Sequence, residues 1–365
     1  MRIAWIIDSN NAGWRPTERV CQSHLASMRL RVAIPSHALS ARGHGTAIFS
    51  PALSNESVRN FNGKNIDIAV FAKLSNPDVA TFRKRAALWL ELADTLKRRG
   101  SRIVADICDN HFGNFHGDYL RTLCAMADMI TVNTPTMGDI VQQHTGRRAS
   151  VCSDPVEGAK MPPRFVPGPR LRVLWFGHQS NLKSCAHALP EFLRLVEHFD
   201  IELHLVTAAH RGAEDICAQI NRQLAPRASA RFTPWSLKVM QPAFEQCDVV
   251  IIPGPPEYQA KVARSANRLI ESLWAGRAVV AHPIASYQEF SSFSYLETDL
   301  ARGVLQAIEH RDETIRRIER GQAYIEAKYT PEKIADQWES ALKQACYPSA
   351  PSAADPTGMA SGPES

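Results

Sequence analysis

Short apolar runs alternate with helical patterns along almost the whole chain, and no other feature constrains the fold as strongly. The runs that we interpret as buried strands occupy residues 2–7, 66–71, 102–107, 129–132, 149–152, 171–176, 201–206, 231–233, 249–252 and 278–281. Between two of these runs, apolar residues recur at helical spacing from Phe82 to Leu96, which predicts a helix that ends before Gly100. Strands that alternate with helices in this way predict parallel sheets with right-handed crossovers.

Two domains are expected because 365 residues exceed what one hydrophobic core usually organises. The alternation stops at residues 154–170, a proline-rich stretch without a periodic apolar face, which we interpret as a linker. It separates an N-terminal α/β domain of residues 1–153 from a C-terminal α/β domain of residues 171–330. Residues 347–365 are rich in Pro, Ser, Ala and Gly without periodicity, a composition typical of a disordered tail.

Composition limits the classes of partner. The formal net charge of +5 is spread along the chain, with no basic patch interleaved with aromatic residues, so we expect no nucleic acid partner. No run approaches the roughly 20 apolar residues of a membrane-spanning helix. The eight cysteines are scattered without CxxC pairs, which favours reduced, buried thiols. We therefore expect a cytoplasmic protein, in which any membrane contact is peripheral and at the inner face.

Polar residues follow the run at 171–176, at a place where open parallel sheets bind ligands. Gly177 allows the backbone to approach a ligand, and the helix that starts near His178 and Ser180 offers N–H groups and a positive dipole to a phosphate. Lys183 adds a full positive charge. The alternative is an ordinary strand–helix turn with a solvated lysine.

A second cluster of polar residues follows the run at 249–252. Arg264, Asn267 and Arg268 lie at the start of a short helix, where two cations and a helix N-terminus form a candidate anion site. Glu271 lies further along that helix, and its carboxylate is suited to accept both hydroxyls of a ribose. The alternative is that the two arginines pair with Glu271 at helical spacing or with solvent.

The stretch from Asp248 to Ala281 resembles the C-terminal half of retaining GT-B glycosyltransferases, especially the family 4 group (glycosyltransferase group 1). In that family an Asp opens a strand that ends in Pro-Ser. Two Glu residues separated by seven others follow, then Ala-x-x-x-Gly-x-Pro and a Val-Val strand. Here Asp248 opens the strand, Pro253 ends it, and Glu271 falls on the second Glu.

Three further stretches resemble the same family in the same order. Residues 30–44, which end in Arg-Gly-His, resemble its first helix, and residues 127–134 resemble its Ala-Asp-x-Ile strand. Residues 321–342 resemble its closing helices, the last of which returns to the N-terminal domain. The resemblance therefore implies that residues 331–346 pack on that domain, and it covers residues 1–345 in all.

The resemblance implies an α/β protein of the GT-B fold, in which two Rossmann-like domains with parallel sheets face each other across a cleft. The C-terminal domain of such enzymes binds a nucleotide-sugar, here of UDP or GDP type, with Glu271 on the ribose. The implied activity is transfer of the sugar to an unidentified acceptor with retention of anomeric configuration, in polysaccharide or glycoconjugate biosynthesis. No cofactor is implied, and no DxD-type metal site is evident in the sequence.

Two positions depart from the family pattern. Lys183 matches a phosphate-binding Lys, but His178 stands where the family has an Arg. Ala263 stands where the first Glu, which touches donor sugar hydroxyls, is expected, and Arg264 is a candidate to replace the charge lost at 178. These departures leave open a catalytically silent GT-B protein that binds a nucleotide-sugar or partners a true transferase. Other GT-B enzymes, such as nucleotide-sugar 2-epimerases, are a further alternative.

Candidate residues in the N-terminal half lie after the first and third of these runs. Similar enzymes place a His beyond the run that corresponds to 102–107, facing donor sugar and acceptor, and His111 is the match. A structural, hydrogen-bonding histidine is the alternative. Gly13 and Trp14 are candidates to line the acceptor side, and Arg29 and Arg31 are candidates to contact an anionic donor or acceptor.

Overall fold

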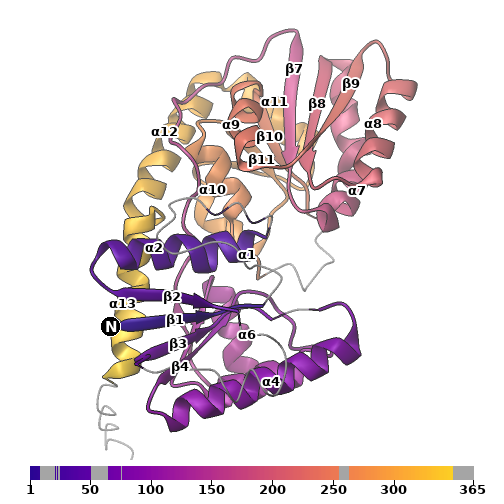
Figure 1. Ribbon diagram of the computed structural model, residues 1–365. Coiled ribbons are helices and arrows are strands. Elements are labelled where there is room, and N and C mark those ends of the chain that lie inside the picture. The colour runs from indigo at the N-terminus through magenta and orange to yellow at the C-terminus, as the bar shows by residue number, and fades with distance from the viewer. Residues whose placement is uncertain are drawn as a thin grey trace, which may run out of the picture.

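The computed structural model describes residues 1–8, 21, 23, 25–50, 65–74, 76–254 and 263–347. These residues form two lobes, each built around a six-stranded sheet in which every paired strand is parallel (Figure 1). The predicted fold class, α/β with two parallel sheets, is therefore confirmed.

The first sheet belongs to the N-terminal half of the chain. Its strands, in spatial order, are β2 (Gly45–Phe49), β1 (Arg2–Ile6), β3 (Ile68–Phe71), β4 (Arg102–Ile107), β5 (Met129–Val132) and β6 (Ser150–Val151). The helices of this half are α1 (Ala26–Met28), a π-helical turn (Arg29–Ala33), α2 (Ile34–Ala41), α4 (Val79–Arg98), α5 (Gly117–Met126) and α6 (Pro135–Thr145).

The second sheet belongs to the C-terminal half. Its strands, in spatial order, are β12 (Tyr295–Leu296), β11 (Ala278–Ala281), β10 (Val249–Ile252), β7 (Arg170–Phe176), β8 (Asp200–Thr207) and β9 (Ala228–Pro234). The α-helices are α7 (Leu182–Leu193), α8 (Arg211–Gln223), α9 (Leu237–Glu245), α10 (Asn267–Trp274), α11 (Leu300–Glu309), α12 (Arg311–Lys328) and α13 (Pro331–Cys346). Short 3-10 helices occupy Gln179–Asn181, Arg194–Glu197 and Ala285–Phe290.

The predicted strands and helices appear where the apolar pattern places them. Central strands such as β3 and β10 are buried along their whole length, which is why they read as continuous apolar runs. The helix predicted around 82–96 is α4, and Thr134 caps α6 as predicted, its hydroxyl accepting from the Met137 N–H at 3.1 Å. The sequence did not predict β2, a half-exposed edge strand, or the two-residue β12.

The last helix crosses back to the first lobe. α13 lies against the first lobe (Figure 1), where it contacts α2, β4 and β5. Its Trp338 meets Trp5 of β1 edge-on, with ring centroids 4.8 Å apart. Both indoles are fully buried in one core with Ile334 and Leu342. The C-terminal helix thus stabilises the N-terminal sheet and ties the two ends of the described chain together.

The stretch between the two sheets contains no helix or strand before β7. It lies against the second lobe, where its Met161 N–H donates to the Trp274 carbonyl at 3.1 Å and its Arg164 N–H to the Gly276 carbonyl at 2.9 Å. Gly276 adopts a φ of 68°, and a Cβ there would collide with the Pro162 carbonyl oxygen. Glycine is therefore required where α10 ends beneath this segment.

Candidate active site

Charged and polar side chains of both lobes converge beyond the carboxyl ends of their strands. Lys73 follows β3 and Asp109 follows β4, whereas His178 follows β7 and Arg264 precedes α10. Burial, followed by the charges of Lys73 and Arg264, lowers the pKa of His178. Burial and Arg268 lower the pKa of Arg264, and Asp109 opposes them. The two lobes therefore face each other here within electrostatic reach.

The predicted donor-binding residues Gly177, Arg264 and Arg268 lie together. Arg264 Nη1 donates to Asn181 Oδ1 at 2.7 Å, and Arg268 Nη1 lies 3.4 Å from the Phe176 carbonyl oxygen. A Cβ on Gly177 would lie 3.4 Å from Arg268 Nη1, so the arginine packs directly on this backbone. Among the residues that the structure describes, neither arginine forms an ion pair, which leaves both positive charges available to an anion.

The turn after Gly177 is capped by His178. Its Nδ1 accepts from the Ser180 N–H at 3.2 Å and lies 3.0 Å from Ser180 Oγ. Fewer free N–H groups than predicted are therefore available to a phosphate, since the Ser180 N–H already donates to the histidine ring. Lys183 lies in the first turn of α7 with an exposed side chain.

The Glu271 carboxylate has no hydrogen bond or ion pair among the described parts of the chain, and Glu271 is half-buried. Burial and then Glu157 raise the pKa of Glu271 to about 8, and Arg29 and Arg268 oppose the shift. A carboxylate in such surroundings is costly unless donors reach it. The alternative in which the arginines of α10 pair with Glu271 does not occur.

Arg29 joins three parts of the chain near Glu271. Its Nε donates to both carboxylate oxygens of Glu157, at 2.8 and 3.0 Å. Its guanidinium lies 4.4 Å from the centroid of the Trp235 ring, which follows β9. Trp235 was not predicted as a site residue, although its position directly after a strand could have indicated it. Arg29 therefore already holds an anionic partner, and its predicted contact with an anionic donor or acceptor stays a prediction.

The structure contradicts the predicted contact of Arg31 with an anionic donor or acceptor, because its side chain does not face the cleft. Its side chain is only 2% exposed, and its Nη2 and Nη1 lie 2.5 Å from Asp106 Oδ1 and 3.1 Å from Asp154 Oδ1. It also donates to the Cys152 carbonyl. With every face of the guanidinium occupied, Arg31 is a structural residue and not a contact for an anionic substrate.

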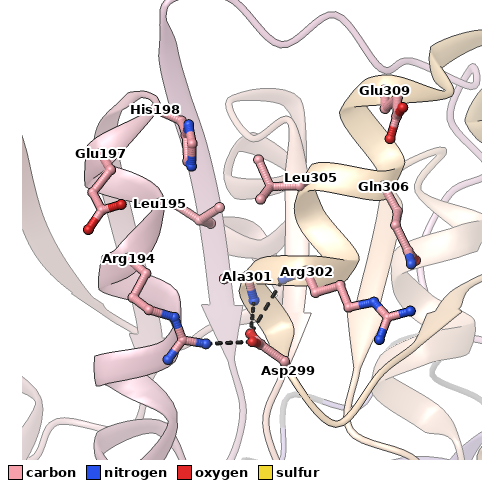
Figure 2. A pocket seen from close by; sticks show the side chains of 10 residues that line it. All are labelled: Arg194, Leu195, Glu197, His198, Asp299, Ala301, Arg302, Leu305, Gln306 and Glu309. Atoms are coloured by element: carbon pink, nitrogen blue, oxygen red, sulfur yellow. Dashed lines mark hydrogen bonds and ion pairs between the residues drawn. The ribbon is translucent and has the colours of Figure 1, made fainter.

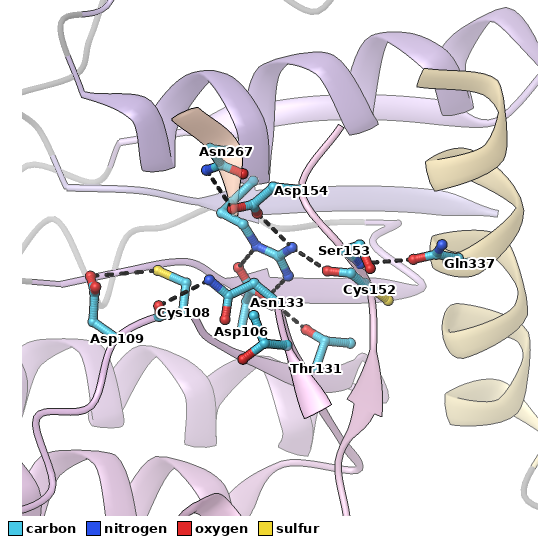
Figure 3. A network of polar contacts seen from close by, with 12 residues as sticks. Asp106, Cys108, Asp109, Thr131, Asn133, Cys152, Ser153, Asp154, Asn267 and Gln337 are labelled. Atoms are coloured by element: carbon cyan, nitrogen blue, oxygen red, sulfur yellow. Dashed lines mark hydrogen bonds and ion pairs between the residues drawn. The ribbon is translucent and has the colours of Figure 1, made fainter. Parts of the chain in front are cut away.

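Asn267 extends the same network into the second lobe. Its Nδ2 donates to Asp154 Oδ2 at 2.8 Å, so that β4, the start of the linker and α10 are held together (Figure 3). Thr131 contributes a further hydrogen bond, from Oγ1 to Asp106 Oδ1 at 2.9 Å. In this structure Asn267 positions α10, while its Oδ1 has no hydrogen-bond partner among the described residues.

His111 lies in the loop after β4, half-buried at the cleft. It lines a small pocket of about 20 Å³ with Lys73, Asp109 and His116. Its ring stacks on His116 with centroids 4.9 Å apart, and its Nδ1 lies 3.2 Å from Asn114 Nδ2. Burial and Lys73 lower the pKa of His111 against the opposing effect of Asp109, so the imidazole is neutral at pH 7. Gly13 and Trp14 lie outside the described residues.

Ala263 lies in the contact between the lobes. Its side chain is 2% exposed and packs in the core of the N-terminal lobe, and its carbonyl accepts from Thr134 Oγ1 at 3.1 Å. The position that carries a sugar-binding Glu in the family is thus apolar and packed here. Nearby residues of both lobes, among them Thr136 and Asn267, line an interdomain pocket of about 550 Å³.

A pocket of about 420 Å³ on the C-terminal lobe lies between the Arg194–Glu197 turn and α11 (Figure 2). Arg194 Nη2 pairs there with Asp299 Oδ2 at 2.5 Å, while Oδ1 of the same carboxylate accepts from the Ala301 N–H at 2.9 Å and caps α11. These charges already stabilise one another, so the pocket offers no comparable set of unpaired groups.

Three global features accompany the site. No group of three or more His, Cys, Asp or Glu side chains suited to a metal ion occurs among the described residues. Within the same residues, none of the helices combines the length and apolarity needed to cross a membrane. Seven of the eight cysteines are buried, as the sequence predicted, and none of them forms a disulfide with another described residue.

The two-lobed architecture is the GT-B fold of glycosyltransferases. The chain resembles HepE from Anabaena, solved in complex with UDP and glucose, at 15% identity and a TM-score of 0.65, over 94% of this chain and 99% of that one. The catalytic domain of starch synthase IV from Arabidopsis thaliana, bound to ADP and acarbose, is 10% identical with a TM-score of 0.63, covering 94% and 99%. A glycosyltransferase from Rickettsia africae is 10% identical with a TM-score of 0.62, covering 95% and 99%.

These likenesses establish the fold along nearly the whole chain. No protein-family model matches the sequence, and no curated protein matches it either. The fold expected from the resemblance is therefore confirmed by structure, while the activity and the individual roles of the site residues are argued from the site itself.

Proposed function

We propose that the protein is a glycosyltransferase that binds a nucleotide-sugar of UDP or GDP type in the cleft and transfers its sugar to an acceptor. The observation that carries the proposal is the Glu271 carboxylate, which has no partner among the described residues and lies one helical turn from Arg268. A carboxylate for ribose hydroxyls beside uncompensated cations for a diphosphate matches the chemistry of a nucleoside diphosphate. The GT-B structures solved with UDP and with ADP support the same class of ligand.

The chemistry follows from the charge distribution. The bond between the anomeric carbon and the diphosphate oxygen breaks, and the electron pair passes to the leaving diphosphate. Arg264, Arg268 and Lys183 stabilise that charge, which lets cationic side chains do the work that a metal does in other transferases. In the front-face route that we propose, the acceptor oxygen attacks on the departing side, its proton passes to the leaving phosphate, and configuration is retained.

A second candidate is a catalytically silent GT-B protein that binds a nucleotide-sugar or partners a true transferase. It is favoured by Ala263, which packs into the N-terminal core where a Glu would touch the sugar. His178 favours it as well, because its Nδ1 caps a turn instead of supplying a permanent charge. The two candidates predict the same ligand and differ in turnover.

A nucleotide-sugar screen tests both candidates. A ligand that binds the folded state at about 100 times its Kd adds about 2.7 kcal/mol of stability, so a matching UDP- or GDP-sugar should raise the Tm by several degrees. The stabilising donor is then assayed for hydrolysis and for transfer. Turnover supports the transferase, binding without turnover supports the silent protein, and no stabilisation by any donor contradicts both.

Glu271→Gln should weaken nucleotide binding and stabilise the protein at the same time. Loss of hydrogen bonds to a charged group costs about 1.5–3 kcal/mol of affinity. The pKa of about 8 lies above the ordinary value, so ionisation of Glu271 costs stability as the pH rises from 4.5 towards 8. The variant should therefore show a higher Tm at pH 9 and an unchanged Tm at pH 4.

Calorimetry and melting curves on one preparation separate the roles of Glu271. If the carboxylate holds the ribose, wild-type protein also releases protons on binding at pH 7, which calorimetry in buffers of different ionisation enthalpy detects. Unchanged affinity in the stabilised variant would remove Glu271 from the ribose role. A lowered Tm at pH 9 would show instead that the carboxylate stabilises the fold.

A further inference from the structure

Lys73 is a cation of the N-terminal lobe that the sequence analysis did not single out. It lies beyond β3, where its Nζ sits 2.5 Å from Asp109 Oδ2, and its side chain is 31% exposed. It lines the same small pocket of the N-terminal lobe as His111, so the ammonium lies next to the candidate catalytic group.

The cations opposite Lys73 belong to the other lobe. Lys73 contributes to the lowered pKa of His178 after burial, and the charge of Arg264 acts in turn on Lys73. Lys73 is therefore within electrostatic reach of the residues that we propose to hold the diphosphate. It belongs to the other lobe, which Ala263, the residue directly before Arg264, contacts through its side chain and through its carbonyl oxygen.

The charges at this place do not balance. Arg264, Arg268 and Lys183 have no carboxylate partner among the described residues, and Lys73 brings a further positive charge against the single carboxylate of Asp109. Like charges held close together without counterions cost free energy, and a polyanion between them removes that cost. A diphosphate supplies the missing negative charge.

We infer that Lys73 contacts the diphosphate of the donor from the N-terminal lobe and supplies the charge that the family's arginine supplies at position 178. This inference rests on the proposed function. An ammonium has three N–H donors, so Lys73 can keep its bond to Asp109 and donate to a phosphate oxygen. Asp109 positions the lysine.

Lys73 acts as a fixed positive charge and transfers no proton. Burial alone would lower the pKa of Lys73, but Asp109 and Cys108 hold it above its ordinary value, so the ammonium persists at neutral pH. The charge on the diphosphate grows as the bond to the sugar breaks, and a cation at that place stabilises the transition state more than the bound donor. Because Lys73 comes from the opposite lobe, its contact would link the bound diphosphate to both lobes.

The test compares Lys73→Met with Lys73→Arg, Arg264→Met and Lys97→Met. Lys97 is the matched control, since it lies in the last turn of α4 and donates to the Met126 carbonyl, near the amino ends of β4 and β5 and away from the carboxyl ends that Lys73 follows. Calorimetry measures binding of UDP and GDP, of uridine and guanosine, and of inorganic pyrophosphate. Melting curves establish that each variant is folded.

Lys73→Met should weaken binding of the preferred nucleoside diphosphate and of pyrophosphate by about 10- to 100-fold. Nucleoside binding should not change, Lys73→Arg should recover most of the affinity, and Lys97→Met should behave as wild type. Where a donor sugar is turned over, kcat should fall further than affinity.

Two results would overturn the role of Lys73 and leave the proposed function standing. One is wild-type diphosphate affinity in Lys73→Met while Arg264→Met loses it. The other is an equal loss of nucleoside and diphosphate binding, which would mean that the substitution acts through the fold. Failure of wild-type protein to bind any nucleoside diphosphate would instead contradict both the proposed function and this inference.

Discussion

Arg31→Ala should lower the free energy of unfolding by about 3–5 kcal/mol, the usual cost of removing one partner from a buried ion pair. The side chains of Asp106 and Asp154 are 0% and 5% exposed, and Arg31 is the cation that compensates them. Its loss leaves two carboxylates close together in the interior, with no cation between them to offset their repulsion.

Arg42→Ala is the matched control for Arg31. Arg42 follows the same helical segment and also contacts two carboxylates, those of Asp336 and Glu339, but its side chain is 29% exposed. Exposed ion pairs contribute at most about 1 kcal/mol, so this variant should unfold close to wild type. Urea unfolding measures both variants. A loss of less than 1 kcal/mol for Arg31→Ala would show that the buried network relaxes or admits water.

The network around Arg31 explains why the sequence could place this residue but not assign its role. Arg31 is separated from Asp106 by 75 residues and from Asp154 by 123, and no local spacing reports such a pair. The position of Arg31 at the start of the first helix favoured a contact with a ligand over a buried ion pair. Partners brought together only by the complete fold decide whether a charge faces the solvent or the interior.

The strands were predictable for the opposite reason. A strand buried on both faces, such as β4, is marked by its own residues and needs no knowledge of its neighbours. β2 was not predicted, because its residues are half-exposed at the edge of the sheet and Gly45 stands at its start. Helix caps such as Thr134 were equally local, so the architecture could be derived almost completely from the sequence.

The site could be derived only in part. Arg264 and Arg268 were found because they lie at one helix start, and Glu271 because it matches the family motif. None of the three forms an ion pair among the described residues. Lys73 was overlooked although it follows a predicted strand, because a single lysine in a loop carries no pattern of its own. Its relation to Arg264 exists only once the two lobes face each other.

His111→Ala should lower turnover of the preferred donor by about 10²- to 10³-fold, the range typical of losing one side chain whose interaction with the reacting groups strengthens in the transition state. Donor affinity should change little, because the groups that we propose for the nucleotide belong mainly to the other lobe. The pKa of His111 lies below its ordinary value, so wild-type activity should be lost only as the pH falls below about 6.5. The variant should lack this acidic limb.

His187→Ala is the matched control, since His187 is exposed on α7. It should retain both its rate and its Tm. A structural His111 would behave differently from a catalytic one, because the loss of its contacts with His116 and Asn114 would lower the Tm while activity followed the amount of folded protein. Steady-state rates, a pH–rate profile and melting curves on the same preparation separate the two roles. Near-normal turnover in a stable His111→Ala variant would exclude this imidazole from the chemistry and direct the search for a catalytic group to Asp109 beside it.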